Sequence, residues 1–234
     1  MRLFQRSPYF FMRSVRSISP AVAVLAGLLM AVGATAHEFD VIVVGPDGLP
    51  VPDVVVFVEG GDTERLDKGS QPDVVMDQLD TQFVPHMLVV QKGTAVVFPN
   101  SDTVAHHVYS FSKPNNFVLP LYKGNPHEPV VFEHDGIVTL GCNIHDDMLA
   151  YIVVVESNAF GLTDASGRVR LSVDDRTANF AVRIWSPRIR DGEDLLIQQV
   201  AAPASIETGL TFALRKRLRA PHDEATDAVA WSEY

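Results

Sequence analysis

Short runs of valine, isoleucine and phenylalanine dominate the sequence from about residue 39 onward. Turn-forming pairs such as Lys92-Gly93, Asp135-Gly136 and Ser166-Gly167 separate these runs, and the apolar positions do not follow a sustained helical period. The pattern predicts an all-β fold, a sandwich or barrel of many short strands. The predicted strands are 39–44, 54–58, 83–91, 95–98, 107–111, 130–132, 137–140, 150–155, 168–173, 180–185 and 210–214, and 194–200 is compatible with either helix or strand.

The first 36 residues have a different pattern from the rest of the chain. A basic start with four arginines precedes a short apolar run, Ala21–Gly33, which is followed by the small residues Ala34-Thr35-Ala36. This order is typical of a cleaved secretory signal peptide, and the run is short for a transmembrane helix. An uncleaved N-terminal anchor is the alternative. We therefore expect a periplasmic protein that begins at His37 and is not held at the membrane after cleavage.

Charge and cysteine content limit the classes of function. The 234-residue chain has 29 acidic and 19 basic residues, and removal of the signal segment leaves 15 basic residues and a net charge of about −14. Such a negative chain argues against binding to nucleic acids, whose phosphates require a basic surface. The single cysteine, Cys142, excludes an intrachain disulfide and a metal site built from cysteines alone. An unpaired thiol is a liability in an oxidising compartment, so we expect Cys142 to have a function.

Residues of the types that bind metals cluster in one loop and at the start of one predicted strand. The predicted strand 137–140 runs into a loop where Cys142, His145 and Met148 have the spacing C-x2-H-x2-M, and His106 and His107 lie upstream. A thiolate and two imidazoles in a plane, with a weakly bound thioether, suit a copper ion that alternates between Cu(I) and Cu(II). The residues therefore predict a mononuclear copper site. Strand alternation does not decide whether His106 or His107 is the upstream ligand.

The arrangement resembles that of the cupredoxins, the type 1 or blue copper proteins, and the loop spacing is similar to that of amicyanin and plastocyanin. Asn100 precedes His106 by six residues, as an asparagine precedes the first ligand in amicyanin-like proteins. The resemblance covers about 74–155. Within this range the chain is similar in particular to exported bacterial cupredoxin-like proteins labelled methylamine-utilisation proteins. It implies a Greek-key β-sandwich and one-electron transfer rather than catalysis. The implied ligands of one copper ion are His106, Cys142, His145 and Met148.

Three positions depart from the family pattern. His107 stands where many cupredoxins have an asparagine that ties the two ligand segments together, so Asn100 and Asn143 are the candidates for an equivalent tie. Asp146 and Asp147 replace the largely apolar residues between the ligands of amicyanin-like loops. We expect these carboxylates to favour Cu(II) over Cu(I) and to attract a redox protein partner with a basic docking surface.

The flanking segments resemble a second kind of sandwich. Runs within 41–56 and 163–185 are similar to the first and later strands of a carboxypeptidase-regulatory-like, Ig-like β-sandwich. The expected organisation is a signal peptide (1–36), N-terminal strands of a flanking sandwich (37–72), an inserted cupredoxin domain (73–156), C-terminal strands of the flanking sandwich (157–220) and a flexible acidic tail (221–234). A single elaborated sandwich is the alternative, and insertion is compatible with host ends that lie close together.

Two other functions are compatible with an exported β protein. One is copper binding for homeostasis, without electron transfer, but such carriers usually expose clusters of methionine or histidine. After residue 36 the chain has only three methionines, Met76, Met87 and Met148. The other is a metal-free envelope interaction module. A copper oxidase acting alone is disfavoured, because the chain has no His-x-His pairs to build a trinuclear cluster.

Overall fold

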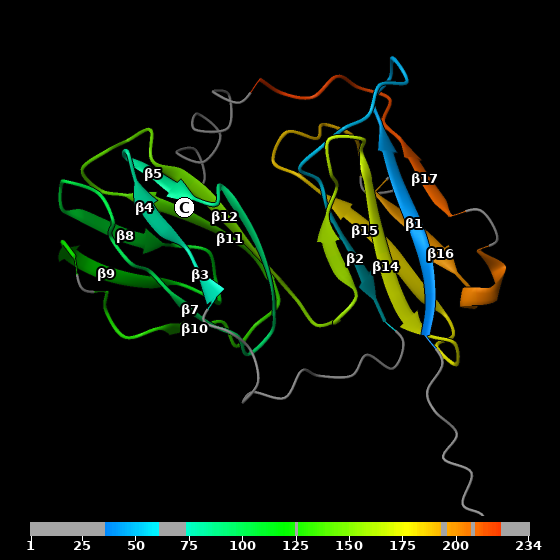
Figure 1. Cartoon of the computed structure of the whole chain (residues 1–234), viewed down its shortest axis with the longest axis horizontal. Coiled ribbons are helices and arrows are strands. Elements are labelled where there is room, and N and C mark those ends of the chain that lie inside the picture. The colour runs from blue at the N-terminus through cyan, green and yellow to red at the C-terminus, as the bar shows by residue number, and fades with distance from the viewer. Residues whose placement is uncertain (1–35, 61–73, 125, 193–195, 207–208, 221–234) are drawn as a thin grey trace, which may run out of the picture. The chain divides into compact units, whose positions relative to one another are not determined.

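The computed structural model describes residues 36–60, 74–124, 126–192, 196–206 and 209–220 (Figure 1). Residues 1–35 of the predicted signal segment, the predicted acidic tail (221–234) and residues 61–73 lie outside these residues. The described residues form β-strands and one short 3₁₀ helix, Pro203–Ser205, which confirms the all-β prediction. In this part of the chain, no helix has the length and apolar character needed to cross a membrane.

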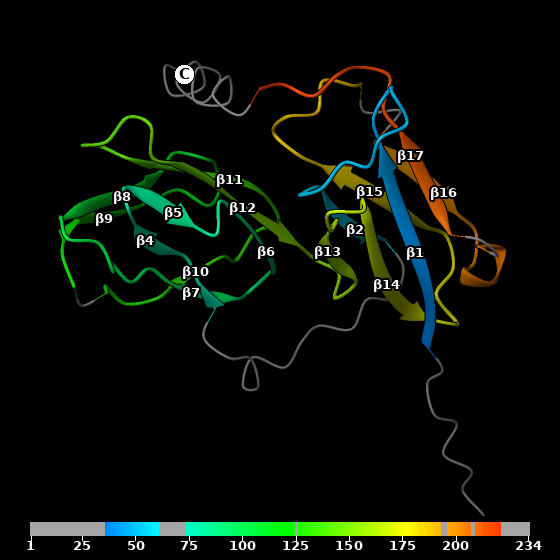
Figure 2. The same ribbon diagram turned by 45° about the horizontal axis from the view of Figure 1, so that its top comes forward.

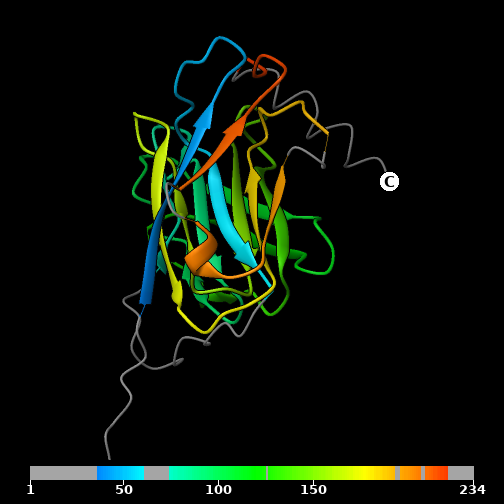
Figure 3. The same cartoon turned by 90° about the vertical axis from the view of Figure 1, so that its right-hand side faces the viewer.

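Strands from the two ends of the described chain pair with one another. β1 (Ala36–Val44) runs antiparallel to β14 (Arg168–Asp174) and parallel to β17 (Leu210–Ala213), as Figure 3 shows. A second sheet has the order β13-β2-β15-β16. Its strands are β2 (Val55–Glu59), β13 (Phe160–Leu162), β15 (Phe180–Trp185) and β16 (Ile197–Val200). Alternate apolar residues from both sheets enclose one core, which includes Phe39, Phe180 and Phe212.

The strands between these end segments form three further sheets. Five strands have the order β6-β12-β11-β8-β9, three the order β10-β7-β3, and β4 pairs with β5. Their bounds are β3 (Val74–Val75), β4 (Asp77–Leu79), β5 (Gln82–Val84), β6 (Met87–Gln91), β7 (Ala95–Val97), β8 (His106–Ser110), β9 (Phe117–Tyr122), β10 (Val130–Val131), β11 (Gly136–Cys142) and β12 (Leu149–Val155). Figure 2 shows β7 and β10 facing the five-stranded sheet. A core that includes Phe98, Phe132 and Leu140 fills the space between them.

The strand pairing has the pattern that an insertion requires. β2 ends at Glu59 and β13 begins at Phe160, and these two strands are antiparallel neighbours, so the intervening chain leaves and returns at adjacent places. The division into a flanking sandwich and a cupredoxin domain stays a prediction. β12 is buried on both faces. The side chains on the face of Ile152 pack in the core just described, and those on the face of Tyr151 pack with Met87 in another cluster. Its continuous apolar sequence follows from this double burial.

Several predicted elements differ from those observed. A single strand over 83–91 is wrong: β5 and β6 are separated at Pro85, which has no N–H to donate to a neighbouring strand. The ambiguous stretch 194–200 contains the strand β16. Four strands were not predicted, namely β3, β4, β9 and β13. β4 has polar residues at Asp77 and Gln78, and β9 contains Pro120, so neither shows a clear apolar alternation.

Candidate metal site

Two neighbouring strands bring the metal-binding residues together. β8 begins at His106 and β11 ends at Cys142. The antiparallel pair Cys142↔Val108 places these two strand ends side by side, at the same end of the five-stranded sheet. Strand alternation turns both side chains inward, where His106 is 0% exposed and Cys142 is 3% exposed. The loop after Cys142 closes with a hydrogen bond from the Met148 N–H to the His145 carbonyl (3.0 Å) and enters β12.

Three donor atoms converge at this end of the sheet. The Sγ of Cys142 lies 3.8 Å from the Nδ1 of His106 and 3.6 Å from the Nδ1 of His145. The two Nδ1 atoms lie 3.1 Å apart. Among the described residues, this is the one group of three or more His, Cys, Asp or Glu side chains whose donor atoms are close enough to share a metal ion.

These separations fit three ligands around one cation. Imidazole nitrogens about 2.0 Å and a thiolate sulfur about 2.3 Å from a shared ion lie roughly 3–4 Å from one another when they approach in a plane. One thiolate and two imidazoles form the donor set of mononuclear electron-transfer copper sites. The residues therefore fit a copper ion, and the assignment of His106, Cys142 and His145 as copper ligands stays a prediction.

Met148, the fourth predicted ligand, follows His145 by three residues and is buried. Its side chain is 1% exposed and belongs to the same apolar cluster as Cys142. A thioether in this position suits a weak axial interaction, which stays a prediction. His145 is only partly buried, whereas Asp146 and Asp147 are exposed, so the site approaches solvent on the His145 side.

His106 and His107 face opposite sides of β8. Whereas His106 joins Cys142 and His145, the ring of His107 lies 6.0 Å from the ring of Tyr109, centroid to centroid, on the other face of the strand. The Nδ1 of His107 is buried, and within the described residues it has no hydrogen-bond partner. The geometry thus brings to the candidate site the histidine that the family pattern indicated.

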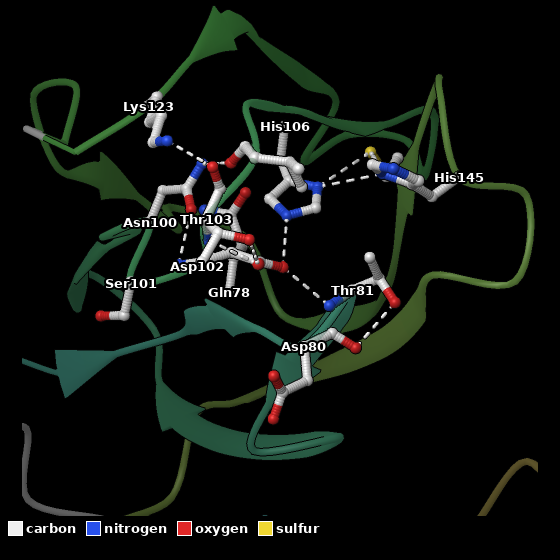
Figure 4. A network of polar contacts seen from close by, with 12 residues as sticks. Gln78, Asp80, Thr81, Asn100, Ser101, Asp102, Thr103, His106, Lys123 and His145 are labelled. Atoms are coloured by element: carbon white, nitrogen blue, oxygen red, sulfur yellow. Dashed lines mark hydrogen bonds and ion pairs between the residues drawn. The ribbon is translucent and has the colours of Figure 1, made fainter.

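Asp102 is a residue of the site that the sequence analysis missed. Its Oδ2 lies 3.0 Å from the Nε2 of His106, and its side chain is 7% exposed (Figure 4). The backbone N–H of Thr81 (2.7 Å), followed by the His106 ring, holds the pKa of Asp102 well below its usual range. An ionised carboxylate only accepts hydrogen bonds, so the Nε2 of His106 is the donor and the Nδ1 faces Cys142 and His145.

The signal that could have indicated Asp102 is weak. It lies four positions before His106, in the sequence Ser101-Asp102-Thr103. Acidic residues in such segments usually bond to the backbone of their own turn, and Asp102 also does so, through the Thr103 N–H at 2.6 Å. Its bond with the Thr81 N–H depends on the β4–β5 pair lying beside this turn, which the sequence pattern did not predict.

Asn100, one of the two predicted tie residues, organises the segment that leads to His106. Its Nδ2 donates to the carbonyls of Val104 and Tyr122 (3.0 Å each), and its Oδ1 accepts the N–H of Asp102 (3.0 Å). These bonds connect the turn to β9 and do not reach the Cys142–Met148 loop. Asn143, the other candidate, is exposed. Asn100 therefore supports the ligand His106 from its own side of the site.

The fully buried Gln78 and the partly buried Tyr122 form a polar pair next to this turn. The hydroxyl of Tyr122 donates to the Phe98 carbonyl (2.6 Å) and accepts from the Nε2 of Gln78. Burial raises the pKa of Tyr122 to about 12, so the hydroxyl keeps its hydrogen at neutral pH. The same Gln78 nitrogen donates to the Pro99 carbonyl (2.8 Å). These bonds attach β4 and β9 to the chain that leads into the site.

Comparisons with known proteins give limited similarities. No protein-family model and no curated relative matches the chain. A purple cupredoxin from Nitrosopumilus maritimus is 22% identical over 36% of this chain and 100% of its own, with a TM-score of 0.32. A reduced mutant of amicyanin is 20% identical over 43% of this chain and 98% of its own (TM-score 0.33). A copper-containing nitrite reductase from Thermus scotoductus is 24% identical over 40% of this chain and 25% of its own (TM-score 0.35).

The neighbours found among solved structures thus include cupredoxins. The three neighbours have TM-scores of 0.32–0.35. The donor atoms, burial and charges of the site are observations independent of this likeness.

Proposed function

We propose that the protein binds one copper ion through His106, Cys142 and His145, with Met148 as the weak axial ligand, and transfers single electrons. Bound copper would supply the chemistry by alternating between Cu(I) and Cu(II). One observation carries the proposal: a buried thiol and two imidazole Nδ1 atoms, at the ends of two paired strands and in the loop after one of them, lie 3.1–3.8 Å from one another.

The protein's own residues would favour electron transfer over copper exchange. Cys142 and His106 are buried at strand ends whose backbone is fixed by the β8–β11 pairing, so the donor atoms have little freedom to rearrange between oxidation states. Carriers that hand copper to other proteins need accessible donors, and three of the four proposed ligands are at most 3% exposed. The partly buried ring of His145 is then the route by which an electron leaves.

The surroundings of His145 support a charged protein partner. Asp146 and Asp147 are exposed beside it, and Ile144 is 51% exposed. Carboxylates at the rim accelerate encounters with a positively charged surface and fix its orientation. We propose a redox partner with a basic docking surface, in the periplasm to which the N-terminal segment would direct the chain, and a carrier role rather than an enzymatic one.

Copper titration of the purified protein tests this proposal. We expect one equivalent of Cu(II) to give an intense visible thiolate-to-copper absorption band, which chemical reduction removes and reoxidation restores. Cys142→Ser keeps the size of the side chain but replaces the soft sulfur, so it should lose the band while retaining the β-sheet circular dichroism.

Three results would contradict the proposal. Absence of binding would support the metal-free interaction module. A band that persists in Cys142→Ser would place the copper elsewhere. Copper bound without the band, and passed rapidly as Cu(I) to an acceptor, would support a homeostasis carrier.

A further inference from the structure

We propose that the β4–β5 hairpin (Asp77–Val84) is a positioning element for His106: it holds Asp102 so that His106 keeps its hydrogen on Nε2 and its bare Nδ1 toward the site before any metal binds. The hairpin itself provides no donor atom to the three-residue group. The consequence for copper binding rests on the proposed function, but the state of the metal-free ring does not.

Two carboxylates join the hairpin to the turn that precedes His106. From the hairpin, Asp77 accepts the Oγ–H (2.7 Å) and the N–H (3.2 Å) of Ser101. From the turn, Asp102 accepts the N–H of Thr81 at the hairpin tip (2.7 Å). Each segment thus contributes one acid to the other, and Figure 4 shows the contact of Asp102 with Thr81. The Ser101 N–H also bonds to the Gln78 carbonyl (3.0 Å). The turn can move away only if these bonds break together.

The backbone conformation at the hairpin tip directs the N–H of Thr81 toward Asp102. Asp80 and Thr81 have φ values of 52° and 56°, the left-handed conformation that both central residues of a tight two-residue hairpin adopt. A β-branched residue is unfavourable there. Because only the backbone N–H of Thr81 reaches Asp102, a glycine at this position would keep the contact and relieve the unfavourable conformation.

A carboxylate is needed at position 102, because donors surround both of its oxygens. Oδ2 accepts from Thr81 and His106, and Oδ1 accepts from Thr103. An amide in either orientation would present its NH₂ group to one of these donors. Asp102→Asn therefore keeps the shape of the side chain but replaces the ionised acceptor of His106 by a neutral amide, which turns its NH₂ group either to His106 and Thr81 or to the Thr103 N–H.

Asp77→Asn is the matched control. The Oδ1 of Asp77 accepts the N–H groups of Gln78 and Ser101, and its Oδ2 accepts the Ser101 hydroxyl, which can accept as well as donate. An amide with its nitrogen on the Oδ2 side therefore keeps all three bonds. The two variants make the same chemical change in neighbouring carboxylates of one network. Only the change at position 102 alters the group that accepts from the Nε2 of His106.

The nitrogen atoms of His106 report the outcome directly. Two-bond ¹H–¹⁵N spectra of the metal-free, ¹⁵N-labelled protein should show His106 with its hydrogen on Nε2 in the wild type, in Asp77→Asn and in Thr81→Gly. Asp102→Asn should populate the Nδ1–H form, because the Nδ1 of His145 at 3.1 Å is then the remaining partner. Copper affinity should fall about 10- to 100-fold in Asp102→Asn relative to Asp77→Asn.

A wild-type His106 with its hydrogen on Nδ1 would overturn the inference, as would the same ring form in Asp102→Asn and Asp77→Asn. The wild-type spectrum decides even where Asp102→Asn does not fold. If the protein binds no copper but His106 has the expected form, the proposed function fails and the positioning role of the hairpin stands.

Discussion

His106 shows how the surroundings of one ring determine what it can do. Burial removes it from water, Asp102 accepts from its Nε2, and its Nδ1 lies 3.1 Å from His145 and 3.8 Å from Cys142. His107, the next residue, has none of these contacts because strand alternation turns it to the other face. Two chemically identical side chains therefore have different surroundings because they differ by one position in the strand.

At this scale, sequence spacing could predict Cys142, His145 and Met148, because they lie within one short loop. It could not decide between His106 and His107 without the family resemblance, since both directions of alternation were compatible with apolar neighbours. It also could not find Asp102, whose contact with the Thr81 N–H joins positions 21 residues apart in the sequence. Spacing predicts local groups, whereas supporting contacts depend on which strands lie side by side.

At the scale of elements, the contact between β8 and β11 is close at Gly141. A Cβ added there would lie 2.8 Å from the Cζ and 2.9 Å from the Oη of Tyr109, so the tyrosine ring lies against the bare backbone beside Cys142. The φ of Gly141 is not in the left-handed region, so glycine is required here for space rather than conformation.

We expect Gly141→Ala to lower the free energy of unfolding by roughly 1–3 kcal/mol, because the new methyl group must displace the Tyr109 ring. Urea denaturation measures this effect. In a Tyr109→Ala background the same substitution should cost much less, since the obstructing ring is gone. An equal loss in both backgrounds would show that the ring is not the cause.

The predicted strands succeeded where one face is apolar and failed where polar or proline residues interrupt the alternation. β11 and β12 follow from their largely apolar sequences, and both carry candidate site residues at or next to their ends. β4 was missed because Asp77 and Gln78 are polar, although Gln78 is fully buried. Its buried amide is satisfied in part by the Pro99 carbonyl and Tyr122, partners that a single segment does not reveal.

At the scale of the whole molecule, negative charge dominates, and Asp146 and Asp147 place part of it beside His145. Asp146→Asn with Asp147→Asn should raise the reduction potential of the bound copper. The double variant lacks two nearby negative charges that stabilise Cu(II), the more positive ion, relative to Cu(I). It should also flatten the salt dependence of electron exchange with a basic partner. Voltammetry and stopped-flow kinetics at several ionic strengths measure the two effects.

Glu38→Gln with Asp175→Asn is the control, since it removes the same charge from exposed positions at the β1–β14 sheet. This pair should change neither quantity appreciably. If both double variants gave the same shifts, the effect would come from net charge and not from the rim of the site.

Three residues, from β8, the end of β11 and the loop after it, are proposed to hold one copper ion. X-ray absorption at the copper edge of the copper-loaded protein is the sharpest test, because it identifies the atoms bound to the metal. We expect one short copper–sulfur contact and two imidazole nitrogens in the wild type, and loss of the sulfur in Cys142→Ser. A wild-type spectrum with only nitrogen and oxygen neighbours would contradict it.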